Sequence, residues 1–431
     1  MTRESFFSNR RNLVCRMCLL LCILISCVSF AAALNPQWTY MADEQLQVVD
    51  ISANASVIAA GGDGNTLYVL DNTGKLLWER HLVSPIIYIA ISTDGSSVTA
   101  MNDRGRIFCF NQSGGEIWTY QTNVGMFFGK VTSFFQSPDA SFTVSGNEYG
   151  RLAKINKTGD LVFDIYLARK ILDLSITNDG NWTLTGEEGG HSRLVDAAGN
   201  ITWETNGFAN HVGMAQDGTL FIIGGGEGSL GDFALYRDET RAVYQKMGTV
   251  NDLAITPRGT VTVVASEDGT IYCYDRNGYL VWNYTYNGKP VKMIAIPSDA
   301  SRIAAITSDN HVFLVKNDGS FVGDFLVNFS MKSQVQDISF APDGSSFAAV
   351  SRDRNIYFFR TPLSTAVTTS TPLNADSVTS PLKESATGTL TVPAGTLKST
   401  SPTTTPSAGS GIALFIPLIG LGCLYMIRKN A

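Results

Sequence analysis

Apolar and polar residues alternate in short runs between about residues 38 and 360, and turns rich in Gly, Asp, Asn and Pro separate these runs. The unit from Val250 to Tyr286 shows the pattern most clearly, with runs at 251–255, 261–265, 271–274 and 280–284. Runs of this length that are rich in β-branched and aromatic residues predict strands joined by hairpins. Because no stretch of this region keeps a 3.6-residue apolar period, the sequence predicts an all-β fold.

An aromatic residue recurs at a nearly constant interval along the same region. Its positions are Trp38, Trp78, Trp118, Phe163, Trp203, Tyr244 and Trp282. A turn of the type Ser-Pro-Asp-Gly-Ser follows each aromatic, and in five units the third residue of the turn precedes the next aromatic by 24 residues. A repeat of about 40 residues with four short strands is typical of a β-propeller. Eight such turns predict eight blades, with seven as the alternative if one unit is degenerate.

The two ends of the repeat region are complementary. The last unit stops after its third strand, at Phe359, and a strand at 36–40 precedes the first unit without belonging to it. We expect this N-terminal strand to complete the last blade, since closing the ring removes exposed sheet edges.

The predicted ring spans residues 34–360, and the segments on either side of it indicate export and anchoring. Residues 1–33 combine arginines, an apolar run and an Ala-rich end, which is the pattern of a cleaved signal peptide. A lipoprotein signal ending at Cys27 is the alternative. Residues 361–410 are rich in Thr, Ser and Pro and predict a disordered stalk. Residues 411–427 are uncharged and precede a basic tail at 428–431, which predicts a transmembrane helix with a cytoplasmic C-terminus. The protein is therefore predicted to lie at the cell surface, as a single-pass plasma membrane protein.

Charge and cysteine content exclude two other classes of protein. The chain has a net charge of −6 and no basic stripe, which argues against nucleic acid as a partner. Only Cys109 and Cys273 fall inside the ring, in blades 2 and 6. We expect no disulfide between them because a disulfide needs Cα atoms within about 7 Å.

Several motifs resemble chemical sites, and for each a structural interpretation is favoured. The Gly-x-Gly-x-x-Gly match at 226–231 leads into a predicted strand, whereas a dinucleotide site needs a helix there. The recurring Asp-Gly turns offer one carboxylate each, too few for calcium. The four histidines have no metal-binding spacing, and Glu187 with Glu188 is interpreted as a solvated turn. We expect no catalytic residues, no metal and no cofactor.

Asn-x-Ser/Thr sequons are candidate glycosylation sites on an exported protein. Those proposed as candidates are Asn54, Asn111, Asn156, Asn200, Asn283 and Asn328, and Asn181 heads a further sequon.

The segments Asp71-Asn-Thr-Gly-Lys-Leu-Leu-Trp78 and Asp275-Arg-Asn-Gly-Tyr-Leu-Val-Trp282 resemble the tryptophan-docking repeats of quinoprotein-like propellers. The turn Ala341-Pro-Asp-Gly-Ser345 is also similar to WD40-like repeats, although the Gly-His and Trp-Asp pairs are missing. With its leader, stalk and anchor, the chain resembles archaeal cell-surface propeller proteins. The resemblance implies that tryptophans wedge neighbouring blades together, here Trp38, Trp78, Trp118, Trp203 and Trp282. Catalytic quinoproteins carry vicinal cysteines, which this ring lacks.

Length variation points to one face of the ring. The first-to-second and third-to-fourth strand turns share one face and are uniform, whereas the other connections vary in length. The two longest connections, residues 124–130 and 325–332, are also apolar. We predict that they bind a partner protein or an envelope glycan; alternatively, they plug the central channel. The candidate binding residues are Met126, Phe127, Phe128, Lys130, Phe325, Phe329 and Lys332. The function predicted is a non-enzymatic binding scaffold; the alternatives are a quinoprotein-type redox enzyme and a purely structural envelope component.

Overall fold

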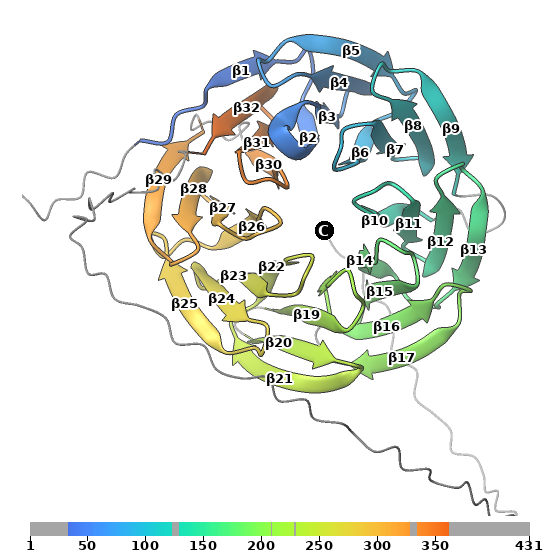
Figure 1. The fold of residues 1–431 in the computed structure, drawn as a ribbon, viewed down its shortest axis with the longest axis vertical. Helices are drawn as coiled ribbons and strands as arrows, with labels where there is room; N and C mark the ends of the chain where they lie inside the picture. The colour runs from blue at the N-terminus through green and yellow to red at the C-terminus, as the bar shows by residue number, and fades with distance from the viewer. Residues whose placement is uncertain (1–32, 123–128, 208, 228–229, 328–333, 362–431) are drawn as a thin grey trace, which may run out of the picture. The chain divides into compact units, whose positions relative to one another are not determined.

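Eight four-stranded antiparallel sheets are arranged as blades around a central axis (Figure 1). The computed structural model describes residues 33–122, 129–207, 209–227, 230–327 and 334–361. Within these ranges the only helix is a single 3-10 turn, η1 (Ala53–Ala55). The prediction of an eight-bladed all-β propeller is confirmed.

Within each blade the first strand lies nearest the axis and the fourth forms the outer wall (Figure 1). The strands of blades 1 to 4 are β2 (Leu46–Ile51), β3 (Ile58–Gly62), β4 (Thr66–Leu70), β5 (Leu76–His81); β6 (Ile86–Ile91), β7 (Ser97–Asn102), β8 (Arg106–Asn111), β9 (Glu116–Gln121); β10 (Val131–Gln136), β11 (Phe142–Asn147), β12 (Arg151–Asn156), β13 (Leu161–Tyr166); β14 (Ile171–Ile176), β15 (Trp182–Glu187), β16 (His191–Asp196) and β17 (Ile201–Asn206).

Blades 5 to 8 continue in the same order. Their strands are β18 (His211–Met214), β19 (Leu220–Glu227), β20 (Leu230–Arg237), β21 (Thr240–Met247); β22 (Val250–Ile255), β23 (Val261–Ser266), β24 (Thr270–Asp275), β25 (Leu280–Thr285); β26 (Val291–Ala295), β27 (Arg302–Thr307), β28 (His311–Lys316), β29 (Phe321–Leu326); β30 (Val335–Phe340), β31 (Ser346–Ser351), β32 (Asn355–Arg360) and, as the outer strand of blade 8, β1 (Trp38–Met41).

The N-terminal strand closes the ring, as the sequence predicts. β1 pairs antiparallel with β32, with Trp38 opposite Phe358. A second tie joins blades 8 and 1, where the backbone N–H of Asn54 donates to Asp343 Oδ2 at 2.9 Å. The first and last strands of the ring therefore hold each other in one sheet.

The hydrophobic core lies between neighbouring blades, so it is divided into slices around the ring. One slice packs Val57 and Val69 of blade 1 against Ile86 and Val98 of blade 2. Cys109 and Cys273 are both buried and free. The faces of each blade are thus buried against its two neighbours, because one sheet cannot bury its own faces.

The outer-strand tryptophans reach into the next blade. Trp78 Nε1 donates to the carbonyl of Gln112 at 2.8 Å, and its ring lies where a side chain at Gly114 would have to go. Trp38 and Trp282 repeat this arrangement with Asn72 and Asn317. The glycine is required twice over, since Gly114 has a φ of +80° and a Cβ there would lie 2.7 Å from the indole.

The Gly-x-Gly-x-x-Gly match forms part of a hairpin. Gly226 pairs with Gly231 in the ladder between β19 and β20, and Glu227 pairs with Leu230. No helix follows, so the motif lengthens the two strands of blade 5 and does not build a dinucleotide site.

Most of the predicted leader at 1–33, the stalk at 361–410, the anchor at 411–427 and the tail at 428–431 lie outside the described residues. Among the described residues, no helix has the length and apolar character needed to cross a membrane.

Candidate functional site: the variable face of the ring

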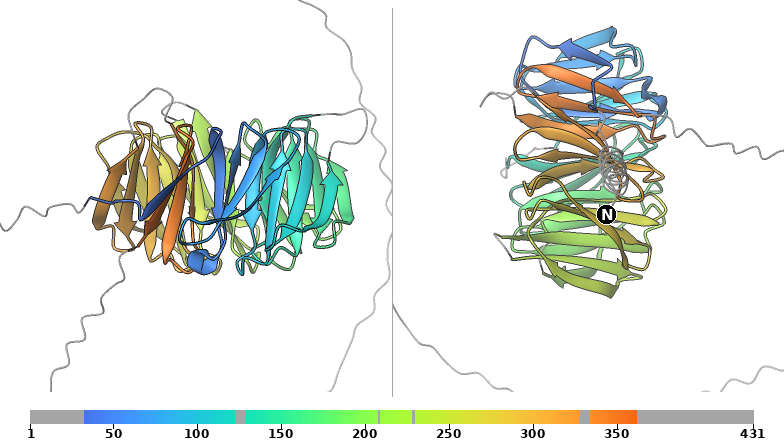
Figure 2. Two further views of the ribbon diagram at one scale, coloured as in Figure 1. Left: turned by 90° about the horizontal axis from the view of Figure 1, so that it is seen from above. Right: turned by 90° about the vertical axis from the view of Figure 1, so that its left-hand side faces the viewer.

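The ring has two faces that differ in their connections (Figure 2). We call the face that carries the first-to-second and third-to-fourth strand turns the uniform face; η1 belongs to it. The face that carries the second-to-third strand loops and the links between blades is called the variable face.

The uniform face is held by short turns whose aspartates bind their own backbone. Asp94 accepts hydrogen bonds from Ser92 Oγ at 2.7 Å and from the Ser96 backbone N–H at 2.9 Å. The Ser92 hydroxyl and the Ser96 groups lower the pKa of Asp94. The same turn geometry recurs at Asp139 and Asp179. These carboxylates are therefore committed to turn formation.

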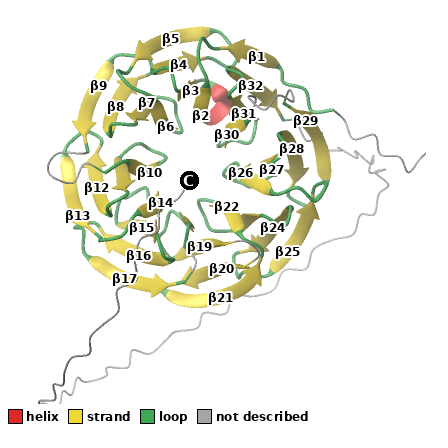
Figure 3. Ribbon diagram, turned by 180° about the vertical axis from the view of Figure 1, so that it is seen from behind, coloured by secondary structure: helices red, strands yellow, loops and turns green. Residues whose placement is uncertain are grey.

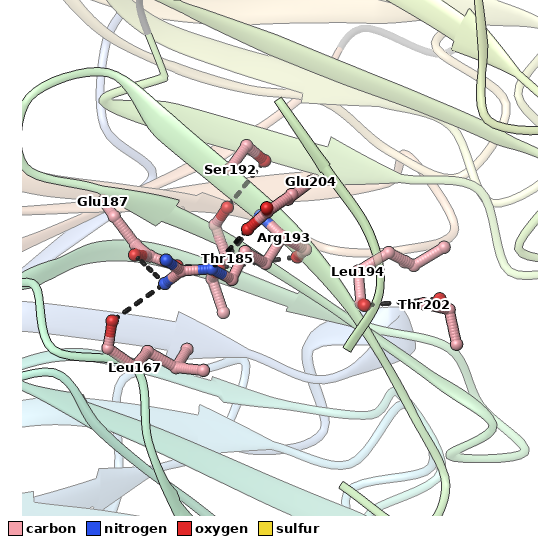
Figure 4. Close-up of polar contacts among 8 residues, drawn as sticks. All are labelled: Leu167, Thr185, Glu187, Ser192, Arg193, Leu194, Thr202 and Glu204. Carbon is pink, nitrogen blue, oxygen red and sulfur yellow. Dashed lines mark hydrogen bonds and ion pairs between the residues drawn. The ribbon is translucent and has the colours of Figure 1, made fainter. Parts of the chain in front are cut away.

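On the variable face, blade 4 holds a buried ion pair (Figure 4). Glu187 is fully buried, and its Oε2 accepts from Arg193 Nη1 at 2.5 Å while Oε1 accepts from Thr185 Oγ1 at 2.8 Å. Arg193 also donates to the carbonyl of Leu167, at 2.9 Å, and to Glu204 Oε2, at 3.3 Å. Burial raises the pKa of Glu187, and Thr185 and Arg193 oppose that rise.

This geometry corrects the interpretation of Glu187 as part of a solvated turn. The side chain ends β15 and points inward, where Arg193 from the neighbouring strand β16 compensates its charge. Because Arg193 also binds the carbonyl of Leu167, the pair fixes the link between blades 3 and 4. It is a positioning element for the variable face.

A second network fixes the link between blades 6 and 7. Tyr286 Oη donates to Asp324 Oδ2 at 2.7 Å, and His311 Nδ1 lies 2.9 Å from the same hydroxyl and 3.1 Å from that carboxylate oxygen. Burial and the neighbouring Asp324 raise the pKa of Tyr286. The group lies between a linker and two strands, so it too positions the variable face.

Exposed apolar side chains lie at the ends of strands and in loops on the variable face. Tyr149 (47% exposed) and Tyr166 (65%) both belong to blade 3, and Val83 (70%) lies in the link between blades 1 and 2. Met41 ends β1 and Leu326 ends β29, and both are exposed. Exposed aromatic and aliphatic groups carried by a rigid scaffold are typical of a protein-binding surface.

Two of the predicted binding residues fall within the described ranges. Lys130 is exposed on the variable face, and its backbone N–H donates to Glu148 Oε1 at 2.8 Å. Phe325 is half-buried in β29, where its ring packs 5.5 Å from Tyr357 and 5.6 Å from Phe359. Phe325 therefore contributes to the packing between blades 7 and 8. The remaining candidates lie outside the described residues: Met126, Phe127, Phe128, Phe329 and Lys332.

Sequence reasoning did not select Tyr149 or Tyr166. Tyr149 lies in the short loop Glu148–Gly150 and packs beside Gly129, and Tyr166 is the last residue of β13. Tyr166 comes three positions after the inward-facing Phe163, so strand alternation points it outward, at the rim where the outer wall meets the variable face. That alternation was the available signal for Tyr166.

The candidate glycosylation sites within the described residues lie at or near the surface. Asn54, Asn111, Asn181, Asn200 and Asn283 are exposed, whereas Asn156 is half-buried. Asn328 lies outside the described residues.

The central channel contains a cavity of about 350 Å³ near its uniform-face end. Its wall includes Phe135, Met214 and Phe340, together with a series of prolines from the first-to-second strand turns. The prolines are Pro138, Pro257, Pro297 and Pro342. Polar residues share the wall, among them Ser175, Gln216 and Ser339, and a cavity of this size lies at the lower end of the range of small-molecule pockets.

Four aspartates on innermost strands link blades around the channel. Asp252 Oδ2 accepts from the backbone N–H of Ile294 in the next blade at 2.8 Å. Asp50, Asp173 and Asp337 make the equivalent bond to the following blade. Burial, with repulsion from Asp173 and Asp337, raises the pKa of Asp252 to about 7.

None of these groups forms a metal centre: within the described ranges, no set of three or more His, Cys, Asp or Glu side chains converges closely enough to hold an ion. The four channel aspartates each serve a different pair of blades.

Comparison with known proteins agrees with the fold. Residues 241–275 and 324–360 match the WD domain, G-beta repeat. No curated protein matches the chain. The C-terminal WD40 domain of Sif2 is similar in structure, with a TM-score of 0.64 at 13% identity, covering 78% of this chain and 100% of that one.

Sqt1 from Chaetomium thermophilum is similar as well, with a TM-score of 0.64 at 14% identity over 76% of this chain and 99% of that one. A second Sqt1 structure, bound to the N-terminus of the ribosomal protein L10, has a TM-score of 0.62 at 16% identity, over 77% of this chain and 99% of Sqt1. At these identities the likeness is one of fold. The chain is an eight-bladed propeller that includes WD40-type repeats.

Proposed function

We propose that the protein is a non-enzymatic scaffold, tethered to the outer face of the plasma membrane, which binds a partner protein or envelope glycan through its variable face. The observation that carries the proposal is the set of exposed apolar side chains on that face, above all Tyr149 and Tyr166. The buried networks around Glu187 and Asp324 support it, because they make the loops a rigid platform.

The general use of the fold supports a protein as the partner. WD40-type propellers are typically protein-binding scaffolds, and Sqt1 has been captured with the N-terminus of a ribosomal protein. Membrane tethering rests on the sequence of the leader and of residues 411–427.

A capture experiment with the full chain in detergent tests the binding face. Solubilised cell envelope is passed over the wild type and over two multiple Ser variants. One changes Val83, Tyr149 and Tyr166 on the variable face; the other changes Leu77 and Ile117, which are also apolar and exposed but lie on the outer wall. Capture that survives on the wall variant and is lost on the variable-face variant supports the proposal, whereas equal capture by both refutes the face assignment.

A third variant extends the test to the long connections. Phe127, Phe128 and Phe329 are changed to Ser together, since they are the aromatic residues of those segments. Loss of capture assigns the connections to binding, whereas retained capture with a lower unfolding temperature favours a packing role for them. The redox alternative predicts a cofactor absorption band in the purified protein.

A further inference from the structure

The outer strands of the eight blades differ in how their free edges are protected. An outer strand leaves unpaired backbone N–H and C=O groups on the wall of the ring (Figure 3). Such an edge can pair with another chain, and proteins commonly prevent this with charged residues or very short strands. All eight outer strands lie within the described residues, so they can be compared directly.

Seven of the eight have one of these protections. β1 has only four residues. The other six carry at least one charged side chain, at Glu79 and Arg80, Glu116, Asp164, Glu204, Arg241 and Lys246, and Asp324. Among these charges, Asp164 is bonded to Arg151 and Asp324 to Tyr286.

β25 has neither protection. Its six residues, Leu-Val-Trp-Asn-Tyr-Thr, contain no charge. Its first two residues, Leu280 (44% exposed) and Val281 (60%), follow Tyr279 (73%) in the preceding turn, so three exposed apolar residues stand in a row. A long, uncharged and apolar edge of this kind is a site for edge-to-edge association.

The same strand carries the sequon Asn283-Tyr284-Thr285. Asn283 is exposed and lies two residues from Val281, so the two side chains share one side of the strand. Trp282 and Tyr284, on the other side, pack toward blade 7. A sugar on Asn283 would therefore lie over Val281 and beside the free edge.

The Asn283 side chain also differs from those of the other sequon asparagines in its hydrogen bonds. In Asn156, Asn181 and Asn200, the side-chain nitrogen donates to an aspartate at 3.3, 2.6 and 2.9 Å. Asn54 and Asn111 hold their turns through Oδ1. Asn283 makes no side-chain hydrogen bond to any described residue, so an attached sugar breaks no such bond.

We propose that Asn283 is N-glycosylated and that its glycan protects the β25 edge from self-association, as charged residues do on the other blades. The donor is a lipid-linked oligosaccharide. A bond forms between Nδ2 and the anomeric carbon of the first sugar, the bond from that carbon to the lipid phosphate breaks, and the amide loses one proton. The inference rests on the proposed export of the ring.

The test uses the full chain, produced through a secretory pathway that N-glycosylates its cargo. Peptide mass spectrometry measures occupancy at each sequon, and light scattering measures the mass of the purified protein. We expect a glycan at Asn283, a monomeric wild type, and a concentration-dependent shift toward dimer in Asn283→Gln. Asn111→Gln is the matched control and remains monomeric.

Two further variants separate the glycan from the asparagine. Thr285→Ser keeps the sequon. It also keeps a hydroxyl at this position, where Thr285 Oγ1 lies 2.9 Å from Thr270 Oγ1. The variant is therefore expected to remain glycosylated and monomeric. Asn283→Lys removes the glycan but adds a charge to the edge, and it is also expected to be monomeric. Self-association of Asn283→Lys equal to that of Asn283→Gln overturns the edge-protection role.

The remaining outcomes are distinct. If other sequons are occupied and Asn283 is not, the inference is wrong while export stands. If no sequon is occupied on a chain that has entered the secretory pathway, the inference is wrong while export stands. If the chain does not enter that pathway, export is refuted and the inference falls with it. An occupied Asn283 with a monomeric Asn283→Gln variant shows a glycan without the proposed role.

Discussion

The uniform and variable faces of one ring are built by different rules. On the uniform face, nearly every turn repeats one local pattern, an aspartate or asparagine that binds backbone groups two residues on, as Asp94 and Asp139 do. On the variable face, a backbone hydrogen bond from the blade link to the second-to-third strand loop also recurs in most blades, as from Leu82 to Asn65, but two links add side-chain contacts of their own, Arg193 with Glu187 and Tyr286 with Asp324. Both faces therefore share a repeated framework, and the side-chain contacts that differ between blades lie on the variable face.

This comparison explains what the sequence could predict. Blade number, strand positions and ring closure follow from local signals, namely the 24-residue spacing, the turns and the orphan strand at Trp38. The networks of the variable face could not be read in this way, because Arg193 binds a carbonyl 26 residues away and Tyr286 binds a carboxylate 38 residues away. The solvated-turn interpretation of Glu187 failed for this reason.

The binding candidates show the same limit. Length and composition directed attention to the long connections, whereas Tyr149 and Tyr166 lie on short, regular segments. Their exposure depends on their position at the edge of blade 3, and the strand pattern of the sequence does not give that position. Phe325 lies in an apolar and aromatic segment, which suggested a binding role, yet its side chain packs against Phe359.

The largest effect is expected where the repeat itself is broken. Trp78→Ala removes the ring that packs on Gly114 and the hydrogen bond to Gln112, and it is expected to lower the free energy of unfolding by roughly 2–3 kcal/mol. Trp78→Phe, the matched control, keeps the ring contact and loses about 1 kcal/mol. Denaturant unfolding measures both; equal losses would show that the indole N–H is the dominant contact.

Breaking a variable-face network is expected to rank next. Glu187→Ala leaves Arg193 half-compensated by Glu204 and is expected to cost about 2 kcal/mol, because a buried charge loses its partner. Exchanging both residues for apolar ones, Glu187→Leu with Arg193→Met, restores much of that loss. If the double variant is as unstable as the single one, packing around the pair is more important than charge.

A single uniform-face turn is expected to contribute less. Asp94→Ala removes the bonds from Ser92 and Ser96 and is expected to cost about 1 kcal/mol. Since these bonds lower the pKa of Asp94, the stabilisation is present above the unfolded-state pKa and is lost as the pH falls through the folded-state value. Thermal unfolding of the variant at pH 7 and at pH 3 should therefore differ from that of the wild type chiefly at pH 7.

A pH-dependent effect is expected from the channel, which both faces share. Burial raises the pKa of Asp252 and of Asp337 to about 7, so the folded ring holds these protons more tightly than the unfolded chain does. Their contribution is complete below the unfolded-state pKa near 4 and is lost as the pH rises through about 7. Asp252→Asn should flatten the decline in unfolding temperature between pH 5 and pH 8, and an unchanged slope would contradict this assignment.

The central claim is that binding depends on the exposed side chains of the variable face, whereas the turns of the uniform face contribute to stability alone. The most direct test measures envelope capture and unfolding free energy on two variants of the full chain, Tyr149→Ser/Tyr166→Ser and Asp94→Ala. The account predicts that the tyrosine variant loses capture at wild-type stability, whereas Asp94→Ala loses stability and captures normally. Capture that follows stability in both variants would contradict it.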